Sequence, residues 1–145
     1  MNTNDFNKDR IYLLDPIKNF VLDNALFYKI IYSTNIVTLN NIILDVKFYN
    51  VSLCKLNNKY KMIIEKNDNK KTVDILYNIE RDILNKINLE GDSIMDMHIN
   101  ILSKNVKVYS EKDLGDKIKE LNLKVKISGI WKTKDNYGIT YKFSL

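Results

Sequence analysis

Lysine and tyrosine stand two positions apart in two segments that otherwise alternate with large apolar residues. Lys47 and Tyr49 form the first pair, and Lys107 and Tyr109 form the second. Residues two apart in a β-strand share one face, so each pair would present one cation and one ring on the same surface. A cation contacts a phosphate group, and a ring stacks on an unpaired base. The other interpretation, a solvated strand face on which Tyr covers its neighbours, stays open.

The segment 124–145 is the densest part of the chain in rings and cations. Trp131 and Tyr137 flank an expected turn, and we expect Tyr137 to be exposed there. Trp131, Tyr141 and Phe143 are each in phase with apolar neighbours, so these three rings fit either the core or a ligand-facing surface. With the two pairs above, the candidate nucleic-acid-binding residues are Lys47, Tyr49, Lys107, Tyr109, Trp131, Lys132, Lys134, Tyr137, Tyr141 and Lys142.

Residue types that commonly carry catalysis or hold metals are scarce in this chain. Cys54 lies in an apolar strand-like segment with no second histidine to serve as a base, so a buried small side chain is expected. Asp96 and His98 share one face of an expected strand, but a metal site needs three or four ligands. Glu90 and Asp92 add carboxylates in a loop without a pattern typical of acid–base pairs. We therefore expect no enzyme activity, no cofactor and no metal site.

The 145-residue chain is long enough for one domain with a substantial core. It has 23 basic and 18 acidic residues, which give a net charge of +5. Residues 1–100 are neutral overall, so the whole excess lies in residues 101–145, as expected of a local contact with a polyanion. No apolar run is long enough to span a bilayer, and the N-terminus does not resemble a signal peptide. We expect no membrane partner and a cytoplasmic location.

Strand periodicity dominates the middle and the end of the chain. The alternation of apolar residues slips by one at Asn50, which indicates a bulge or a tight turn. Asn57-Asn58 predicts a two-residue hairpin turn because Asn tolerates a positive φ. Gly129 and Gly138 indicate a bulge or a close backbone approach. The expected strands are residues 42–49, 51–56, 60–64, 95–101, 106–109, 124–132 and 138–145.

Two segments have patterns typical of helices. Apolar residues at three- and four-residue spacing over 73–87 predict an amphipathic helix, with Thr72 as its N-cap and Gly91 as its end. A capping box opened by Ser110 predicts a short helix over 111–121.

The expected order is three strands, a helix and further strands, which predicts a mainly β fold with one or two helices, of the α+β class. This order is that of an OB-fold, a small five-stranded barrel, although several α+β sandwiches share it. We expect residues 1–33 to form an N-terminal extension packed on the core and residues 34–145 to form the OB-like barrel, within one globular domain. Residues 1–10 are polar and expected to fray, and 17–32 fit a helix or a strand.

The hairpin over residues 129–142 resembles the closing strands of small single-stranded-DNA-binding proteins of AT-rich cytoplasmic replicons, such as large DNA viruses and yeast linear plasmids. Asn, Ile and Lys, which have A/T-rich codons, make up 61 of the 145 residues. The resemblance, mainly in residues 124–145, implies an OB-fold, sequence-independent binding of single strands during DNA replication, and a place in the host cytoplasm or at a viral replication site. Residues 141–145 lack the acidic tail with which many such proteins recruit partners. Under this resemblance Trp131, Tyr137 and Tyr141 would stack on bases, and Lys132, Lys134 and Lys142 would contact phosphates.

The leading hypothesis is a non-enzymatic protein that binds single-stranded nucleic acid through a basic groove and aromatic stacking. It requires the cations of the last third and some nearby rings to line one shared surface. The alternative is a structural or interaction protein, such as a virion or scaffold component, without a nucleic-acid ligand. The sequence leaves open whether the partner is DNA or RNA and whether the chain forms a homo-oligomer.

Overall fold

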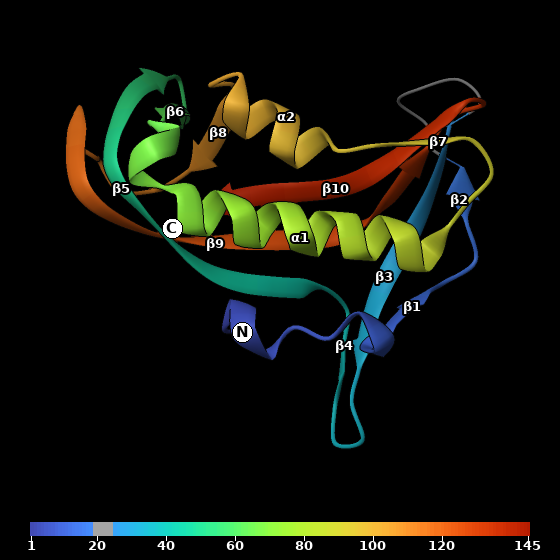
Figure 1. Ribbon diagram of the computed structural model, residues 1–145. Helices are drawn as coiled ribbons and strands as arrows, with labels where there is room; N and C mark the ends of the chain where they lie inside the picture. Colours follow the sequence, from blue (N-terminus) through green and yellow to red (C-terminus); the bar gives the residue numbers. More distant parts are fainter. Residues whose placement is uncertain (19–24) are drawn as a thin grey trace.

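The computed structural model describes residues 1–18 and 25–145. This part of the chain is mainly β and contains two α-helices, which confirms the predicted α+β class (Figure 1). Neither of these helices is long and apolar enough to cross a bilayer. The helical elements are η1 (Thr3–Asp5), η2 (Lys8–Arg10), η3 (Lys66–Asp68), α1 (Lys70–Ile87) and α2 (Asp96–Leu102). The strands are β1 (Ile11–Leu13), β2 (Ile17–Lys18), β3 (Leu26–Ser33), β4 (Thr38–Leu39), β5 (Ile42–Leu56), β6 (Lys59–Ile63), β7 (Asp92–Ile94), β8 (Val106–Tyr109), β9 (Lys117–Lys132) and β10 (Asn136–Ser144).

Five strands form a ring of hydrogen-bonded neighbours. β5 pairs with β6, β6 with β8, β8 with β10, β10 with β9, and β9 with β5 again. The β8–β10 pairing is parallel and the other four are antiparallel. β3 continues the sheet from β9 and carries β1, β2 and β4, and β7 adds a parallel strand to β10. The sheet therefore has side branches attached to a closed set of five strands.

β5 and β9 share a long antiparallel ladder that forms one wall of the ring. The inward and outward positions of β5 slip by one at Asn50, which has a φ of 52°. The predicted slip is therefore confirmed. β5 nevertheless continues through this point as one 15-residue strand, where the sequence predicted two, because β9 pairs with it on both sides of Asn50.

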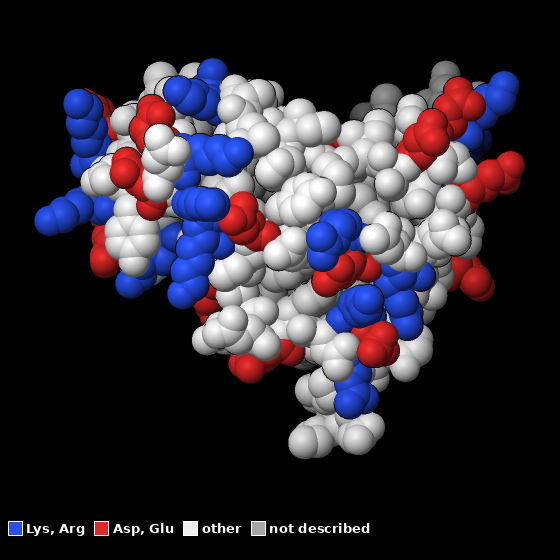
Figure 2. Space-filling model, in the orientation of Figure 1, with Lys and Arg blue, Asp and Glu red and all other residues white. Residues whose placement is uncertain are grey.

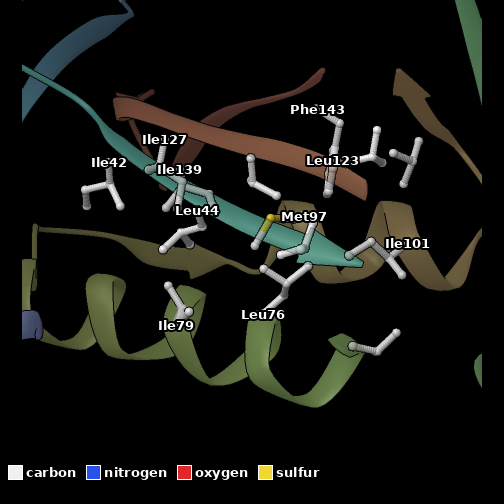
Figure 3. Packing of buried hydrophobic residues seen from close by; sticks show 14 of the residues in the cluster. Ile42, Leu44, Leu76, Ile79, Met97, Ile101, Leu123, Ile127, Ile139 and Phe143 are labelled. Atoms are coloured by element: carbon white, nitrogen blue, oxygen red, sulfur yellow. The ribbon is translucent and has the colours of Figure 1, made fainter. Parts of the chain in front are cut away.

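α1 packs its apolar side against the buried face of the ring strands (Figure 3). Leu76 and Ile79 point from the helix toward Leu44 on β5 and Ile139 on β10, and all four side chains are buried. The spacing of three and four residues that predicted this helix is the spacing that places its apolar residues on one side. The predicted amphipathic helix is confirmed.

Two polar residues at the start of α1 attach the helix to β5. The Asn69 side chain accepts a hydrogen bond from the Tyr49 N–H at 2.7 Å and donates one to the Tyr49 carbonyl at 3.0 Å. The predicted N-cap, Thr72, lies inside the helix and donates its hydroxyl to a β5 carbonyl at 2.8 Å. Asn69 is the N-cap of the helix, so the predicted cap was wrong. The helix ends at Ile87 with Asn88 as its left-handed C-cap, three residues before the predicted Gly91.

Residues 95–101, predicted as a strand, form α2. The Glu80 carboxylate on α1 accepts hydrogen bonds from the N–H groups of Met97 and His98, each at 2.9 Å. These bonds satisfy donors that the first turn of a helix leaves unpaired. Met97 and Ile101 then lie four residues apart on the buried side of α2, so the apolar residues that suggested alternation also fit a helical face.

The helix predicted over 111–121 does not form. The segment is a loop followed by the first residues of β9, in which Leu121 is buried and Ile118 packs partly on the core. The Ser110 hydroxyl accepts the Lys112 N–H in a local turn at 3.1 Å, so the expected capping box is not a helix start. A short isolated helix is marginal in water, whereas the extended segment gains a ladder with β5.

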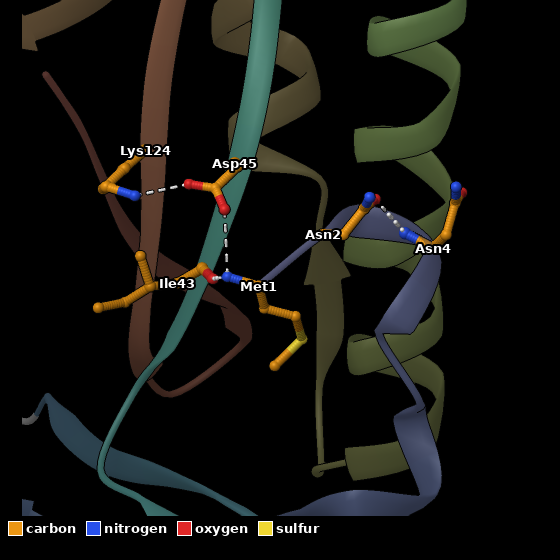
Figure 4. Close-up of polar contacts among 6 residues, drawn as sticks. All are labelled: Met1, Asn2, Asn4, Ile43, Asp45 and Lys124. Atoms are coloured by element: carbon orange, nitrogen blue, oxygen red, sulfur yellow. Dashed lines mark hydrogen bonds and ion pairs between the residues drawn. The ribbon is translucent and has the colours of Figure 1, made fainter.

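Residues 1–10, expected to fray, are held on the body of the protein instead: the first residues lie along β5 (Figure 4), and η2 contacts α1. The Met1 ammonium group donates to the Ile43 carbonyl at 2.8 Å and pairs with Asp45 at 3.4 Å. Asp45 also accepts a hydrogen bond from Lys124 on β9 at 2.6 Å. The expected fraying was wrong because long-range contacts of the folded chain hold this segment, and the polar composition of the segment does not reveal them.

The described parts of residues 17–32, for which the sequence left helix and strand open, are strands. β2 pairs with β3, and β3 pairs with β9. The apolar residues Phe20 and Val21, which contributed to the helical alternative, lie outside the described residues. Beyond β3 the chain forms a narrow hairpin with β4 that projects from the body of the molecule (Figure 1).

Candidate nucleic-acid interface

Four lysines form a row across the outer faces of four neighbouring ring strands. Lys61 on β6 lies opposite Lys107 on β8, and Lys142 on β10 lies opposite Lys126 on β9. The parallel register of β8 and β10 places Lys107 beside Lys142, which joins the two pairs. We refer to these four residues as the lysine row.

The sequence places the row on the outside because each of its lysines alternates with apolar residues. Neighbouring positions on each strand point to opposite faces of a sheet, and the apolar positions are taken up by the core. The buried neighbours of the row are Tyr60 and Met62 on β6, Val106 and Val108 on β8, Phe143 on β10, and Val125 and Ile127 on β9.

The positive charge of the row has no acidic partner among the described residues. None of the ion pairs in this part of the chain includes a row lysine, although other lysines are paired, such as Lys47 with Glu120 at 3.6 Å and Lys55 with Asp113 at 2.9 Å. On the side of the molecule that carries α1, basic side chains lie among acidic ones (Figure 2). Neighbouring strands are about 4.8 Å apart, and like charges directly opposite one another destabilise a sheet. A bound polyanion would relieve this repulsion.

Tyr109 provides a ring next to the row. The Lys142 Nζ lies 4.2 Å from the ring centroid, and the Nζ of Lys59, the cross-strand neighbour of Tyr109, lies 5.9 Å from it. An exposed cation–π contact is worth about 0.5–1 kcal/mol, less than the ~1–3 kcal/mol of a base stacked on a ring. A base can therefore take the place of a lysine over this ring.

Three of the sequence-predicted residues meet at this surface: Lys107, Tyr109 and Lys142. The set of candidate residues left out Lys61 and Lys126 in the row and Lys59 beside Tyr109. The signal was present, because these three lysines alternate with buried apolar residues in the same way as the predicted ones.

Trp131 and Tyr141 are engaged by the protein itself. The Trp131 indole N–H donates to Asp96 at 2.7 Å, and a Cβ built on Gly138 would lie 2.8 Å from the indole. Tyr141 is half-buried, accepts a hydrogen bond from the Asn100 amide at 2.6 Å, and has its pKa raised, chiefly by burial. The register shift next to Thr140 and the close contact at Gly138 confirm the bulge and the close approach predicted for this hairpin.

The residues around the β9–β10 turn lie apart from the row. Tyr137 is only 4% exposed, so the prediction that it is exposed was wrong; it takes an inward position within β10. Lys132 donates to the carbonyls of Glu90 and Thr133 at 2.6 and 3.1 Å. Lys134 is exposed beside a shallow cavity of about 440 Å³ that Lys132 and Glu90 also line.

The remaining predicted pair lies on β5. Lys47 is paired with Glu120, and Tyr49 is 41% exposed. Both line a cavity of about 270 Å³ next to the start of α1. This pair shares a strand face as predicted, but no described contact joins it to Tyr109 or the row.

The other candidate chemical groups do not converge. Cys54 is exposed, so the prediction that it is buried was wrong. After the slip in β5, Val51 and Leu53 point inward, and Cys54 therefore points outward. Asp96 and His98 lie on α2 and not on a strand. Within residues 1–18 and 25–145 there is no group of three or more His, Cys, Asp or Glu side chains that could hold a metal ion.

A polar network supports α2. It consists of Glu80, Asp96, Asn100, Trp131 and Tyr141, and we call it the α2 network. Burial raises the pKa of Glu80 to about 7, against two backbone N–H donors that lower it. Burial likewise raises the pKa of Asp96, against the hydrogen bond from Trp131. Its carboxylates accept internal donors, and neither of them lines the two cavities described above.

Comparisons with protein-family models, curated proteins and solved structures found no match for this chain.

Proposed function

We propose that this protein is a non-enzymatic binder of single-stranded nucleic acid. Phosphates would contact the lysine row, and one base would stack on Tyr109. The observation that carries this proposal is the row itself: four lysines with no acidic partner among the described residues, adjacent across four strands and next to an aromatic ring.

The strand order supports the further proposal that the ring is an OB-fold barrel. An OB-fold is a five-stranded, partly open barrel that binds oligonucleotides on the face of its second and third strands. In ring order these strands would be β6 and β8, which carry Lys61, Lys107 and Tyr109. The proposed place of action is the cytoplasm, at a site of DNA replication; the free, exposed thiol of Cys54 suits a reducing compartment.

A salt titration tests the proposal. Four phosphate contacts on a single strand give a slope of about −3 for log affinity against log salt. Fluorescence anisotropy with a labelled oligo(dT) would measure this slope. In Lys107→Ala/Lys142→Ala two contacts remain, and the slope should fall to about −1.4. Absent binding, or binding that does not depend on salt, would reject the function.

A control variant separates the row from net charge. Lys70→Ala/Lys71→Ala removes the same charge from the start of α1. This variant should keep the wild-type slope. If it weakens binding as much as the row variant does, the protein binds polyanions through its overall charge and the row is not the site.

The projecting hairpin favours a second candidate, a structural protein that assembles with copies of itself. Ile36 at its tip is 96% exposed, and Val37 and Leu39 are also exposed. Residues 34–41 contain no charged side chain, and the end of the hairpin is white in Figure 2. Exposed apolar surface of this kind marks interaction sites. Size-exclusion chromatography with light scattering should then show an assembly of the wild-type protein, which Ile36→Asp should dissociate into monomers. A wild-type protein that is a monomer at all concentrations would reject this candidate.

A further inference from the structure

A cavity of about 890 Å³ lies beside Tyr109. It is open to solvent and is bordered by the β5–β6 turn, the loop between β8 and β9, and the end of β10. Its polar lining includes Asn57 and Asn58 from the turn and Ser110, Glu111 and Asp113 from the loop. The same tyrosine therefore borders the lysine row on one side and a cavity on the other.

The charge of the cavity differs from that of the row. Glu111 and Asp113 are exposed at the cavity, and Asp113 pairs with Lys55 across it at 2.9 Å. Lys55 and Lys112 line the same cavity and balance these two carboxylates, so the cavity attracts a phosphate group less than the row does and suits the uncharged part of a nucleotide. The side-chain amides of Asn57 and Asn58 form no hydrogen bond with any described residue, which leaves them free for a ligand.

We propose that the cavity receives the edge of the base that stacks on Tyr109 and favours a base with an exocyclic amino group, such as cytosine or adenine, over thymine. Carboxylates accept a hydrogen bond from the cytosine amino group, and Asn side chains pair with the adenine edge. Thymine has no amino group, so it offers no such donor to the Glu111 carboxylate. The inference rests on the proposed function, and it adds a base preference at one nucleotide to otherwise sequence-independent binding.

The position of Lys142 is compatible with this arrangement. In the free protein its ammonium group lies over the Tyr109 ring at 4.2 Å. A neighbouring phosphate would attract this flexible side chain away from the ring, and the base would then occupy the vacated face, since stacking is worth more than an exposed cation–π contact. Phosphate contact and stacking would thus be coupled through one lysine.

The test compares an oligo(dT) of about 12 nucleotides with the same oligonucleotide carrying one central dC or dA. One amino-bearing base should fix the binding register and raise affinity roughly tenfold, the effect of one good pairing to a base edge. The double variant Asn58→Ala/Glu111→Ala, which removes both side chains that would bind the base edge, should lose this gain and keep the affinity for oligo(dT). Asn58 is chosen because Asn57 has a φ of 50°, at which Ala would be strained.

The control is Asn85→Ala, the same kind of change on the exposed side of α1; it should keep the gain. Binding that depends on the row lysines without any gain from dC or dA would overturn the inference and leave the proposed function standing. A gain that persists in the double variant would also overturn it, since the preference would then arise elsewhere. If binding by the wild-type protein does not depend on the row lysines at all, both the inference and the proposed function are overturned.

Discussion

The two ends of the β9–β10 pair contain similar residues in opposite situations. At the row end, Lys126 and Lys142 lie side by side without an acidic partner in the described chain, next to Tyr109. At the turn end, Trp131 donates to Asp96, and Lys132 donates to backbone carbonyls. Both ends are rich in rings and cations, but Trp131 and Lys132 at the turn end have internal partners, and Lys134 there is the exposed exception. The two ends therefore differ in how far internal partners occupy their polar groups and not in residue types.

The largest expected effect concerns Glu80, which accepts hydrogen bonds from the first turn of α2, the helix that carries the Trp131 partner Asp96 at the turn end. Burial raises the pKa of Glu80 from its ordinary value of 4.5 to about 7 in the folded protein, so the folded state binds the proton more tightly than the unfolded chain does. Stability contributed by this group is therefore present below pH 4.5 and lost as the pH rises through 7, by about 3 kcal/mol. Urea unfolding of the wild type and Glu80→Gln across this range measures it. Asp96 and His98 titrate in both proteins, so the difference between the two unfolding free energies reports Glu80 alone. A difference that does not change with pH would contradict the prediction.

The next effect distinguishes a structural ring from a ligand-binding one. Trp131→Ala removes a half-buried indole and its hydrogen bond to Asp96, so we expect a loss of about 2–3 kcal/mol in the free energy of unfolding. Affinity for oligo(dT) should stay the same, measured at a temperature at which the variant is folded. Trp131→Phe, which keeps a ring over Gly138, should lose less stability. Weaker binding by a stable Trp131→Phe would place the turn end in the interface.

Local patterns predicted the elements whose own residues alternate or recur with a clear period, wherever their partners lie. Alternation predicted β8 and the β9–β10 hairpin, Asn57-Asn58 predicted the β5–β6 turn, and apolar spacing predicted α1. α2 was missed because the donors of its first turn are satisfied by Glu80, which lies on another helix and is invisible to a local pattern. The first residues of β9 were missed for the same reason, since their partner is β5.

The candidate site was predicted only in part because it depends on register. The sequence showed that Lys107 and Lys142 face away from apolar neighbours, but not that they lie beside each other. Lys61 and Lys126 join them only through the pairing of β6 with β8 and of β10 with β9. Trp131 and Tyr137, which were predicted in the same group, lie apart from the row: Trp131 donates to Asp96, and Tyr137 is buried in the core. These partners are set by the tertiary fold, so the sequence did not separate the two rings from the row.

A smaller effect links stability and binding at the row. Lys107→Glu would replace a cation between Lys61 and Lys142 with an anion, which converts two like-charge contacts into attractive ones. Cross-strand charge pairs contribute roughly 0.2–1 kcal/mol, so thermal or urea unfolding should show a gain of about 0.5 kcal/mol. The same variant should bind oligo(dT) at least tenfold more weakly. Lys134→Glu, with an identical charge change at the turn end, should change both quantities less; equal effects would erase the distinction between the two ends.

The smallest expected effect tests where the interface stops. Lys47 is a predicted binding residue, but it pairs with Glu120 at 3.6 Å on the exposed face of β5. Exposed ion pairs contribute about 0–1 kcal/mol, and no described contact connects this one to the row. We therefore expect Lys47→Ala to change the unfolding free energy by less than about 0.5 kcal/mol and the affinity for oligo(dT) by less than about twofold, measured at low salt, where electrostatic contacts are strongest. A loss as large as that of Lys107→Ala would extend the path of the strand onto β5, since only a direct phosphate contact gives such a loss.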